Sequence, residues 1–372
     1  MKVFLVAGTR PEVIKTAGLV FAARAATDID LVYCSSGQHR SMLDETLADF
    51  GLAADLDLEV MGASGLHGLS SRIVERFAPV LEDHRPDVVL VQGDTATAFS
   101  AALSAYYMKI PVGHVEAGLR TNNFYSPWPE EGNRRLIGSI ASFHFPPTEL
   151  ARANLLCENI PDDTIMVTGN TVIDALLHAS ARMAEGTAER AALDREFSWI
   201  NSSKRLILVT GHRRENFGEG FRNICLSLSR LAQRDDIEIV YPVHLNPDVR
   251  RPVHDMLADA PSVHLIEPLR YRAFVYLMMR CALILTDSGG VQEEAPSLGK
   301  PVLVMRDTSE RMEAVEAGSA KLVGTDSARI VAEAEILLDD VNAYAVMASV
   351  KNPFGDGTAS TKILDWLKSR IG

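Results

Sequence analysis

The chain has 372 residues, of which 47% are hydrophobic and 23% are charged, a composition typical of folded globular proteins and not of disordered or fibrous ones. At roughly 100 to 200 residues per domain, this length predicts two domains. The formal net charge of -12 disfavours nonspecific binding to nucleic acid or to an anionic membrane.

The N-terminal apolar run at residues 3–7 is too short for the core of a signal peptide, and no run reaches the roughly 18 to 20 apolar residues that span a bilayer. The chain has four cysteines, which are widely spaced and form no C-x-x-C pair. This spacing favours a reducing compartment over a disulfide framework or a zinc site. We therefore expect a soluble, cytoplasmic protein.

Short apolar, β-branched runs recur along the whole chain, separated by stretches that could hold a helix. Continuous rather than alternating runs predict strands buried on both faces, and their alternation with helices predicts parallel sheets. The runs are residues 3–7, 31–34, 87–91, 111–115, 165–168, 206–210, 237–243, 263–266, 282–286 and 301–305. About six strands before residue 170 and five or six after it predict an α/β protein with two Rossmann-like, doubly wound domains. A final amphipathic helix is predicted at residues 360–371.

Open α/β sheets bind ligands beyond the carboxyl ends of their strands, so the residues that follow each run are candidates for binding. The first run is followed by Gly8, Arg10 and Lys15, with Pro11 placed to start a helix. An anion could bind there, although the loop is neither a P-loop nor a dinucleotide fingerprint. An equally good interpretation of this loop alone is a helix-starting turn with a surface arginine and lysine.

A stronger candidate anion site follows the run at residues 282–286, where Ser288, Gly289 and Gly290 precede a predicted helix. Small residues at this position expose the N–H groups of the helix start to a phosphate. Glu294, one turn into the helix, could reach ribose hydroxyls. Arg311 could add counter-charge for a diphosphate.

Carboxylates form a third feature, because Asp94 and Glu116 each follow an apolar run and Glu130 lies in a loop fixed by two prolines. A single acid at a strand end is usually a helix cap. Several such acids, together with His212 in the second half, favour acid/base chemistry. Seven other histidines lack metal-ligand spacing, so we expect no metal site. They are His39, His67, His84, His144, His178, His254 and His264.

Nine segments carry a family resemblance: GTRPEVIK (8–15), GDT (93–95), GHVEAGLRT (113–121), SPWPEEGNR (126–134), TGNTVIDAL (168–176), TGHRREN (210–216), YPVHLNP (241–247), LTDSGGVQEEAPSLGKPVLVMRDTSER (285–311) and NPFGDG (352–357). They closely resemble the bacterial non-hydrolysing UDP-N-acetylglucosamine 2-epimerases. The resemblance implies the GT-B architecture, with two Rossmann-like domains, residues 1–170 and 171–357, facing a central cleft. It also implies that a C-terminal helix at 358–372 packs on the first domain, and that the protein is a homodimer.

The resemblance further implies reversible conversion of UDP-GlcNAc to UDP-ManNAc, by anti elimination of UDP to 2-acetamidoglucal and re-addition, without a cofactor. Such a reaction supplies ManNAc-type precursors for cell-surface polysaccharide. Three alternatives remain open. They are a GT-B glycosyltransferase, a hydrolysing epimerase that uses a UDP-sugar, and a nucleotide-sugar sensor without chemistry.

Site residues follow from the matching motifs. The implied catalytic residues are Asp94, Glu116, Glu130 and His212, and which carboxylate removes the C2 proton is left open. The implied UDP contacts are Arg10, Lys15, His212, Leu269, Phe274, Ser288, Gly289, Gly290, Glu294 and Arg311. Some members bind a second UDP-GlcNAc as an allosteric activator, and the residues that resemble this site are Gln38, Arg72, Glu130, Arg213 and His244.

Overall fold

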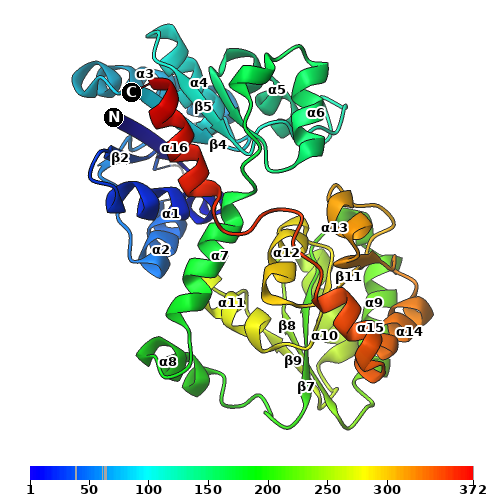
Figure 1. Cartoon of the computed structure of the whole chain (residues 1–372). Coiled ribbons are helices and arrows are strands. Elements are labelled where there is room, and N and C mark those ends of the chain that lie inside the picture. Colours follow the sequence, from blue (N-terminus) through cyan, green and yellow to red (C-terminus); the bar gives the residue numbers. More distant parts are fainter. Residues whose placement is uncertain (38–39, 61, 63–64, 372) are drawn as a thin grey trace. The chain divides into compact units, whose positions relative to one another are not determined.

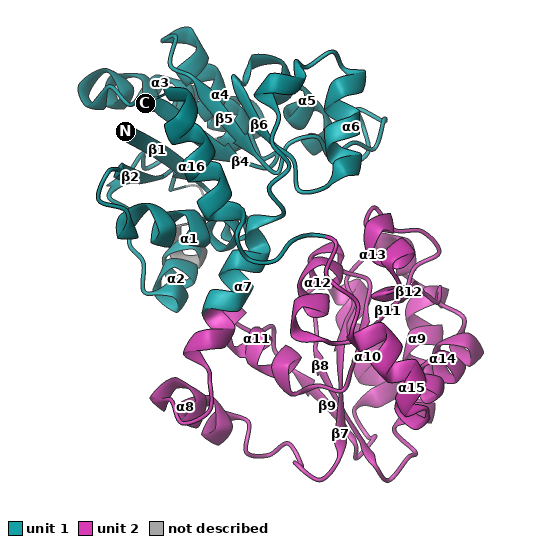
Figure 2. Cartoon of the chain, in the orientation of Figure 1, with its two compact units in different colours: residues 1–178, 354–372 teal, residues 179–353 magenta. Residues whose placement is uncertain are grey.

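The computed structural model in Figure 1 describes residues 1–37, 40–60, 62 and 65–371, and for residues 40–42 only the backbone. The chain divides into two compact units, shown in Figure 2. Unit 1 comprises Met1–His178 and Phe354–Gly372, and unit 2 comprises Ala179–Pro353.

Unit 1 is built on a parallel sheet in the order β3-β2-β1-β4-β5-β6, which is the strand order of the Rossmann fold. The apolar runs explain the sheet's position, because Phe4 and Val6 of β1 pack against one layer of helices while Val3 and Leu5 pack against the other. The strands are β1 (Lys2–Ala7), β2 (Asp30–Ser35), β3 (Leu56–Asp57), β4 (Val88–Gln92), β5 (Val112–Val115) and β6 (Phe143–Phe145).

Helices cover both faces of this sheet. One face packs against α3 (Gly65–His84), α4 (Ala96–Tyr107) and α5 (Glu130–Ile140). The other packs against α1 (Arg10–Ala25), α2 (Arg40–Phe50) and the C-terminal α16 (Ala359–Ile371). Burying each large apolar side chain in these layers stabilises the folded protein by roughly 1.5–3 kcal/mol. The remaining helices are α6 (Glu149–Cys157), the 3-10 helix η1 (Asp162–Thr164) and α7 (Thr171–Arg182), which runs across the boundary between the units.

Unit 2 repeats the same topology, with a parallel sheet in the order β12-β11-β10-β7-β8-β9. Numbered within the unit, this is again the Rossmann order. The strands are β7 (Arg205–Thr210), β8 (Ile237–Pro242), β9 (Val263–Ile266), β10 (Leu283–Thr286), β11 (Val302–Val304) and β12 (Ala320–Leu322).

One face of the second sheet buries Ile207 and Val209 against α9 (Glu219–Leu231), α10 (Pro247–Leu257) and α14 (Ser327–Asp339). Helix α11 (Tyr271–Arg280) contacts β7. The remaining elements are α8 (Ala188–Glu196), η2 (Arg214–Asn216), α12 (Gly289–Glu294), η3 (Ala295–Leu298), α13 (Met312–Ala317) and α15 (Val341–Ala348).

The prediction of two doubly wound, Rossmann-like domains of the GT-B class is confirmed. The strand predicted at residues 165–168 is wrong, because only Ile165 forms a bridge, to His144 of β6. The N–H groups of Met166 and Thr168 bond to the carbonyls of His144 and Pro146, after which the chain leaves the sheet. The sequence missed β3, β6 and β12, which are two or three residues long.

The C-terminal helix belongs to unit 1, where Asp174 of α7 accepts hydrogen bonds from the backbone N–H groups of Ala359 and Ser360. We keep the two-domain division as a proposal and move its boundary from residue 170 into α7, between His178 and Ala179. Within the described part of the chain, no helix has both the length and the apolarity needed to cross a membrane.

Candidate functional site

In unit 1, three neighbouring strands bring the predicted residues to one edge of the sheet. β1 pairs with β4, and β4 pairs with β5, all in parallel. The loops that begin at Gly8, Gly93 and Glu116 therefore leave the sheet side by side. The first loop must pass close to its neighbours, because a Cβ atom on Gly8 would lie 2.2 Å from Ser36 Oγ and 2.3 Å from Thr97 Oγ1. Only glycine fits there.

Glu116 lies directly after β5 and is held by two neighbours. Its carboxylate accepts hydrogen bonds from Lys15 Nζ at 2.5 and 2.6 Å and from Gln92 Nε2. The side chain of Glu116 is only 5% exposed, so the lysine supplies the counter-charge that a buried carboxylate needs. Glu116 also has φ = 63°, an uncommon backbone conformation for a residue with a side chain, and one that is frequent at functional sites. Lys15, which is predicted as a diphosphate contact, is therefore in direct contact with the Glu116 carboxylate.

Asp94 sits in the turn after β4 and is fixed from α5. Its carboxylate forms an ion pair with Arg134, whose Nε lies 3.1 Å from Asp94 Oδ2. Asn133 donates its side-chain amide to the Asp94 carbonyl at 2.8 Å. Two consecutive residues of α5 therefore fix both the side chain and the backbone of Asp94.

The same turn is also fixed by Glu12, which is 1% exposed. Glu12 accepts hydrogen bonds from the Gly8 N–H at 3.0 Å, from the Thr9 hydroxyl at 2.8 Å and from the Thr95 hydroxyl at 2.6 Å. Burial raises the pKa of Glu12, and these hydrogen bonds oppose the rise. Glu12 thus links the loop after β1 to the turn after β4.

His114, in β5, supports the other side of the turn. It is completely buried, and its Nε2 lies 2.8 Å from the Gly93 carbonyl. Burial lowers the pKa of His114 to about 3, so the ring is neutral at pH 7 and Nε2 must carry the proton that it donates. Nδ1 has no hydrogen-bond partner among the described residues.

Glu130 begins α5 and is half-buried, whereas the next residue, Glu131, is fully buried. Glu131 accepts hydrogen bonds from the N–H groups of Thr121 and Asn122 and from Arg135. Burial acts to raise the pKa of Glu131, but these hydrogen bonds and the nearby arginines lower it overall. Glu131 is therefore a structural anchor of this loop, whereas Glu130 is partly exposed.

In unit 2, the polar loops again follow neighbouring strands, because β10 lies between β7 and β11. Asp287, directly after β10 and completely buried, joins the first two loops. It accepts hydrogen bonds from the N–H groups of His212 (3.0 and 3.1 Å) and Arg213 (2.9 Å) and from the Asn216 side chain (3.2 Å). Asp287 thus fixes the position of the His212 loop beside the turn at Ser288.

Two arginines lie at the start of α12. A Cβ atom on Gly289 would lie 3.6 Å from Arg311 Cζ and 3.7 Å from Arg213 Nη2. Arg311 also contacts Glu293, with 2.6 Å between Nε and Oε1. The Nε of Arg213 is buried without a partner in the described part of the chain. Two guanidinium groups beside a small-residue turn suit a phosphate group.

His212 lies at the same edge of the sheet. Its side chain is 42% exposed, and its Nδ1 is 3.6 Å from Asp287 Oδ1. Its ring stacks with that of His244, with 5.6 Å between the centroids. Burial lowers the pKa of His212, while the negative charge of Asp287 acts in the opposite direction. The lowered pKa favours the neutral imidazole, which can donate one hydrogen bond and accept another.

The predicted base and ribose contacts lie in unit 2, on α11 and α12 and in the segment just before α11. Leu269 and Phe274 are half-buried, before and within α11. Glu294 is the last residue of α12 and is 6% exposed. It accepts a hydrogen bond of 2.7 Å from the hydroxyl of Tyr271, the first residue of α11.

The residues predicted for an activator site are distributed between the two units. Arg72 lies on α3 and Glu130 on α5 of unit 1, while Arg213 and His244 follow β7 and β8 of unit 2. Gln38 lies outside the described residues.

Sequence reasoning missed the residues that hold the predicted ones in place. Gln92 and Asp287 could have been found, because each lies at the end of an apolar run. The others act across elements that are distant in sequence, so only the topology identifies them. They are Glu12, His114, Asn133, Arg134 and Tyr271.

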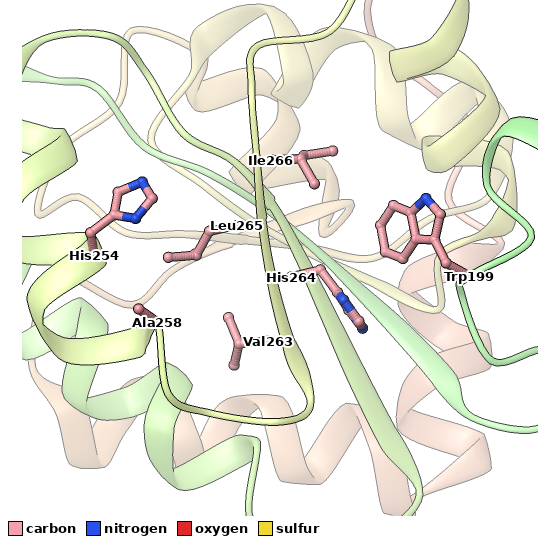
Figure 3. A pocket seen from close by; sticks show the side chains of 7 residues that line it. All are labelled: Trp199, His254, Ala258, Val263, His264, Leu265 and Ile266. Atoms are coloured by element: carbon pink, nitrogen blue, oxygen red, sulfur yellow. The ribbon is translucent and has the colours of Figure 1, made fainter.

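A separate pocket of about 400 Å³ lies along β9, lined by residues of β9, by His254 of α10, by Ala258 directly after α10 and by Trp199 (Figure 3). It contains none of the predicted site residues. His264 in this pocket contacts Glu238, with 2.6 Å between Nε2 and Oε1. Within the described ranges, no group of three or more His, Cys, Asp or Glu side chains is arranged to hold a metal ion.

Comparison with known proteins gives consistent matches along the whole chain. A family model described as UDP-N-acetylglucosamine 2-epimerase matches residues 22–368. The UDP-N-acetylglucosamine 2-epimerase of Salmonella typhimurium is 54% identical over 371 residues, which cover 99% of each chain. The crystal structure of the UDP-GlcNAc 2-epimerase from Neisseria meningitidis bound to UDP-GlcNAc is 49% identical, with a TM-score of 0.90 and coverage of 99% of this chain and 100% of that one. The Methanocaldococcus jannaschii UDP-GlcNAc 2-epimerase in complex with UDP-GlcNAc and UDP is 35% identical, with a TM-score of 0.80 and the same coverage.

Proposed function

The chain belongs to the UDP-N-acetylglucosamine 2-epimerase family, and we propose that it interconverts UDP-GlcNAc and UDP-ManNAc without hydrolysing them. The observation that carries this proposal is the similarity over 99% of the chain to a structure with UDP-GlcNAc bound. The polar residues at the strand ends of both units support it. Carboxylates lie in unit 1, and two arginines beside a small-residue turn lie in unit 2.

In the proposed first step, a carboxylate of unit 1 removes the proton from C2 of the sugar while the C1–O bond breaks. The C2–H electron pair forms the C1=C2 double bond of 2-acetamidoglucal, and the C1–O pair leaves with UDP. C2 has no neighbouring ketone, so its proton becomes acidic only as positive charge develops at C1. Carboxylates stabilise that charge, and cations stabilise the departing diphosphate.

The second step reverses the first with the opposite stereochemistry. A proton is added to the other face of C2, and a UDP oxygen attacks C1. Two faces require an acid/base group on each side of the ring, and we assign these roles among Asp94, Glu116 and Glu130. Every bond broken in the first step is re-formed in the second, so the reaction is redox-neutral and needs no nicotinamide.

We assign UDP to unit 2, together with Arg10 of unit 1. Ser288, Gly289, Gly290 and Arg311 would hold the diphosphate, and neutral His212 would donate a hydrogen bond to the leaving phosphate. Glu294 would bind the ribose, and Leu269 and Phe274 the uracil. Lys15 would act through Glu116, because the two are in direct contact.

The products formed from UDP-GlcNAc test this function. We expect a stable mixture of UDP-GlcNAc and UDP-ManNAc, without accumulation of free UDP. Accumulation of ManNAc and UDP would instead indicate a hydrolysing epimerase. Sugar transfer to an added acceptor without epimerisation would indicate a glycosyltransferase, and binding without any turnover would indicate a sensor.

We further propose that a second UDP-GlcNAc activates the enzyme through Gln38, Arg72, Glu130, Arg213 and His244. Starting from UDP-ManNAc alone, the reaction should then show a lag that traces of UDP-GlcNAc abolish. A linear time course from the first turnover would rule out this activation.

The proposed enzyme is a homodimer that works in the cytoplasm and supplies ManNAc-type precursors for cell-surface polysaccharide. The four cysteines, none of which is in a disulfide, are consistent with a reducing compartment. Analytical ultracentrifugation should give twice the chain mass of 40.6 kDa. A sedimenting species of a single chain mass would contradict the dimer.

A further inference from the structure

Tyr271 is a buried residue of unit 2 that has no role in the proposed reaction. It begins α11, is 5% exposed, and donates its hydroxyl proton to Glu294 Oε1 at 2.7 Å. Burial is the main cause that raises the pKa of Tyr271 well above its usual value, and Glu294 raises it further. The hydroxyl therefore stays protonated at physiological pH and serves as a donor to the carboxylate.

This hydrogen bond restricts a flexible side chain. A glutamate has three rotatable side-chain bonds, and fixing such a side chain on binding carries a cost in conformational entropy. In this protein, folding has already met that cost, because the tyrosine holds one carboxylate oxygen. A pre-positioned carboxylate binds a hydroxyl group more tightly than one that must be ordered on binding.

The same bond connects two helices that carry different parts of the proposed nucleotide site. Leu269 and Phe274, assigned to the uracil, flank Tyr271 in sequence at the start of α11. Glu294 ends α12, which begins at the proposed diphosphate turn. Tyr271 thus fixes the ribose carboxylate relative to the segment that binds the base.

We propose that Tyr271 is a positioning residue that orients Glu294 toward the ribose hydroxyls, and that this pair makes the enzyme discriminate ribonucleotide from deoxyribonucleotide sugars. The inference rests on the proposed function, in which Glu294 binds the ribose. A site that forms hydrogen bonds with a substrate hydroxyl rejects the analogue that lacks it, because its own polar group is then left unpaired.

Tyr271→Phe tests the proposal, because it removes only the hydroxyl group. Tyr276→Phe is a matched control on the same helix, since Tyr276 also donates its hydroxyl to a carboxylate, Asp194, at 2.6 Å. Binding of UDP, 2′-deoxy-UDP and 3′-deoxy-UDP is measured by calorimetry, and kcat and KM are measured with UDP-GlcNAc.

We expect Tyr271→Phe to weaken UDP binding by up to roughly 10- to 30-fold, because the Glu294 side chain must then be ordered when UDP binds. The same change should weaken the binding of at least one deoxy analogue much less than that of UDP. The ratio between the two dissociation constants should therefore become smaller. The loss should appear in KM more than in kcat. The control should retain the binding and kinetics of the parent enzyme. Adding Tyr271→Phe to Glu294→Gln should cause little further loss, since both changes disrupt the same interaction.

Equal weakening of UDP and both deoxy analogues would overturn the proposal, as would equal effects of Tyr271→Phe and Tyr276→Phe. Additive losses in the double variant would also overturn it. Because nucleotide binding is measured without turnover, these outcomes are independent of the epimerase reaction. Failure of the parent enzyme to epimerise would count against the proposed function alone.

Discussion

At the scale of single residues, the site of unit 1 consists of carboxylates whose surroundings differ. Glu116 is buried and contacts Lys15, Asp94 is paired with Arg134, and Glu130 is half-buried at the start of α5. Acid/base chemistry on two faces of one carbon needs groups with different environments, because one must accept a proton and another must donate one. The three carboxylates differ in their environments, as such chemistry requires.

Glu116→Gln should keep UDP binding and lose turnover. The amide retains the shape of the side chain but neither exchanges a proton nor carries the charge that pairs with Lys15. Removing a general acid/base group typically costs roughly 10²- to 10⁴-fold in kcat, which a coupled assay or NMR can follow. Asp87→Asn is the control, since Asp87 precedes β4, at the amino edge of the same sheet. Unchanged kcat in Glu116→Gln would remove Glu116 from the mechanism.

The buried His114 should make stability depend on pH. Its pKa is about 3 in the folded protein and about 6.5 in the unfolded chain, so the unfolded chain binds more protons between these values. The free energy of unfolding should therefore fall as the pH is lowered from about 6.5 toward about 3, with a slope of up to ~1.4 kcal/mol per pH unit from this residue. His114→Gln should remove that part of the slope in denaturant titrations at pH 7.5, 5.5 and 4.5. Parallel pH profiles for the two proteins would contradict this assignment.

At the scale of secondary-structure elements, hydrogen bonds between distant segments define the geometry of the site. The turn after β4 is held by Glu12 of α1, His114 of β5 and Asn133 of α5. In unit 1 a similar bond fixes the C-terminal helix, since Asp174 of α7 accepts two N–H groups at the start of α16. The first N–H groups of a helix lack partners within the helix, so such a carboxylate stabilises the helix end.

Asp174→Ala should therefore destabilise unit 1 and expose α16. Loss of a capping carboxylate costs about 0.5–2 kcal/mol, and leaving buried N–H groups unpaired adds to this cost. Hydrogen exchange of the α16 amides should accelerate before that of the β-sheet amides. Asp365→Ala is the control, because Asp365 lies on the exposed side of α16 with its side chain 62% exposed. Exchange in α16 that matches the parent protein would show that this cap does not hold the helix.

The fold could be predicted from the sequence more completely than the site. The continuous apolar runs predict the long central strands, because parallel strands buried on both faces need them. The short edge strands β3, β6 and β12 have too few residues to show a pattern, and Ile165 forms only one bridge. Strand-end reasoning located Asp94, Glu116 and His212. The supporting contacts of Glu12 and Tyr271 required the topology, since their partners are 83 and 23 residues away in sequence.

At the scale of the whole molecule, the net charge of -12 and a dianionic ligand are compatible. In unit 2, Arg213 and Arg311 approach the small-residue turn at Gly289. In unit 1, part of the negative excess consists of the carboxylates assigned to catalysis. Local arrangement, rather than the total charge, therefore determines which anion the protein can bind.

Elimination and re-addition of UDP through a glucal can be tested by NMR of the reaction of UDP-GlcNAc in deuterated water. Because the proton lost from C2 exchanges with solvent before re-addition, we expect UDP-ManNAc with one deuterium, at C2, and intact UDP-sugars at equilibrium. UDP-ManNAc that retains the original hydrogen at C2 would rule out elimination and re-addition through a glucal.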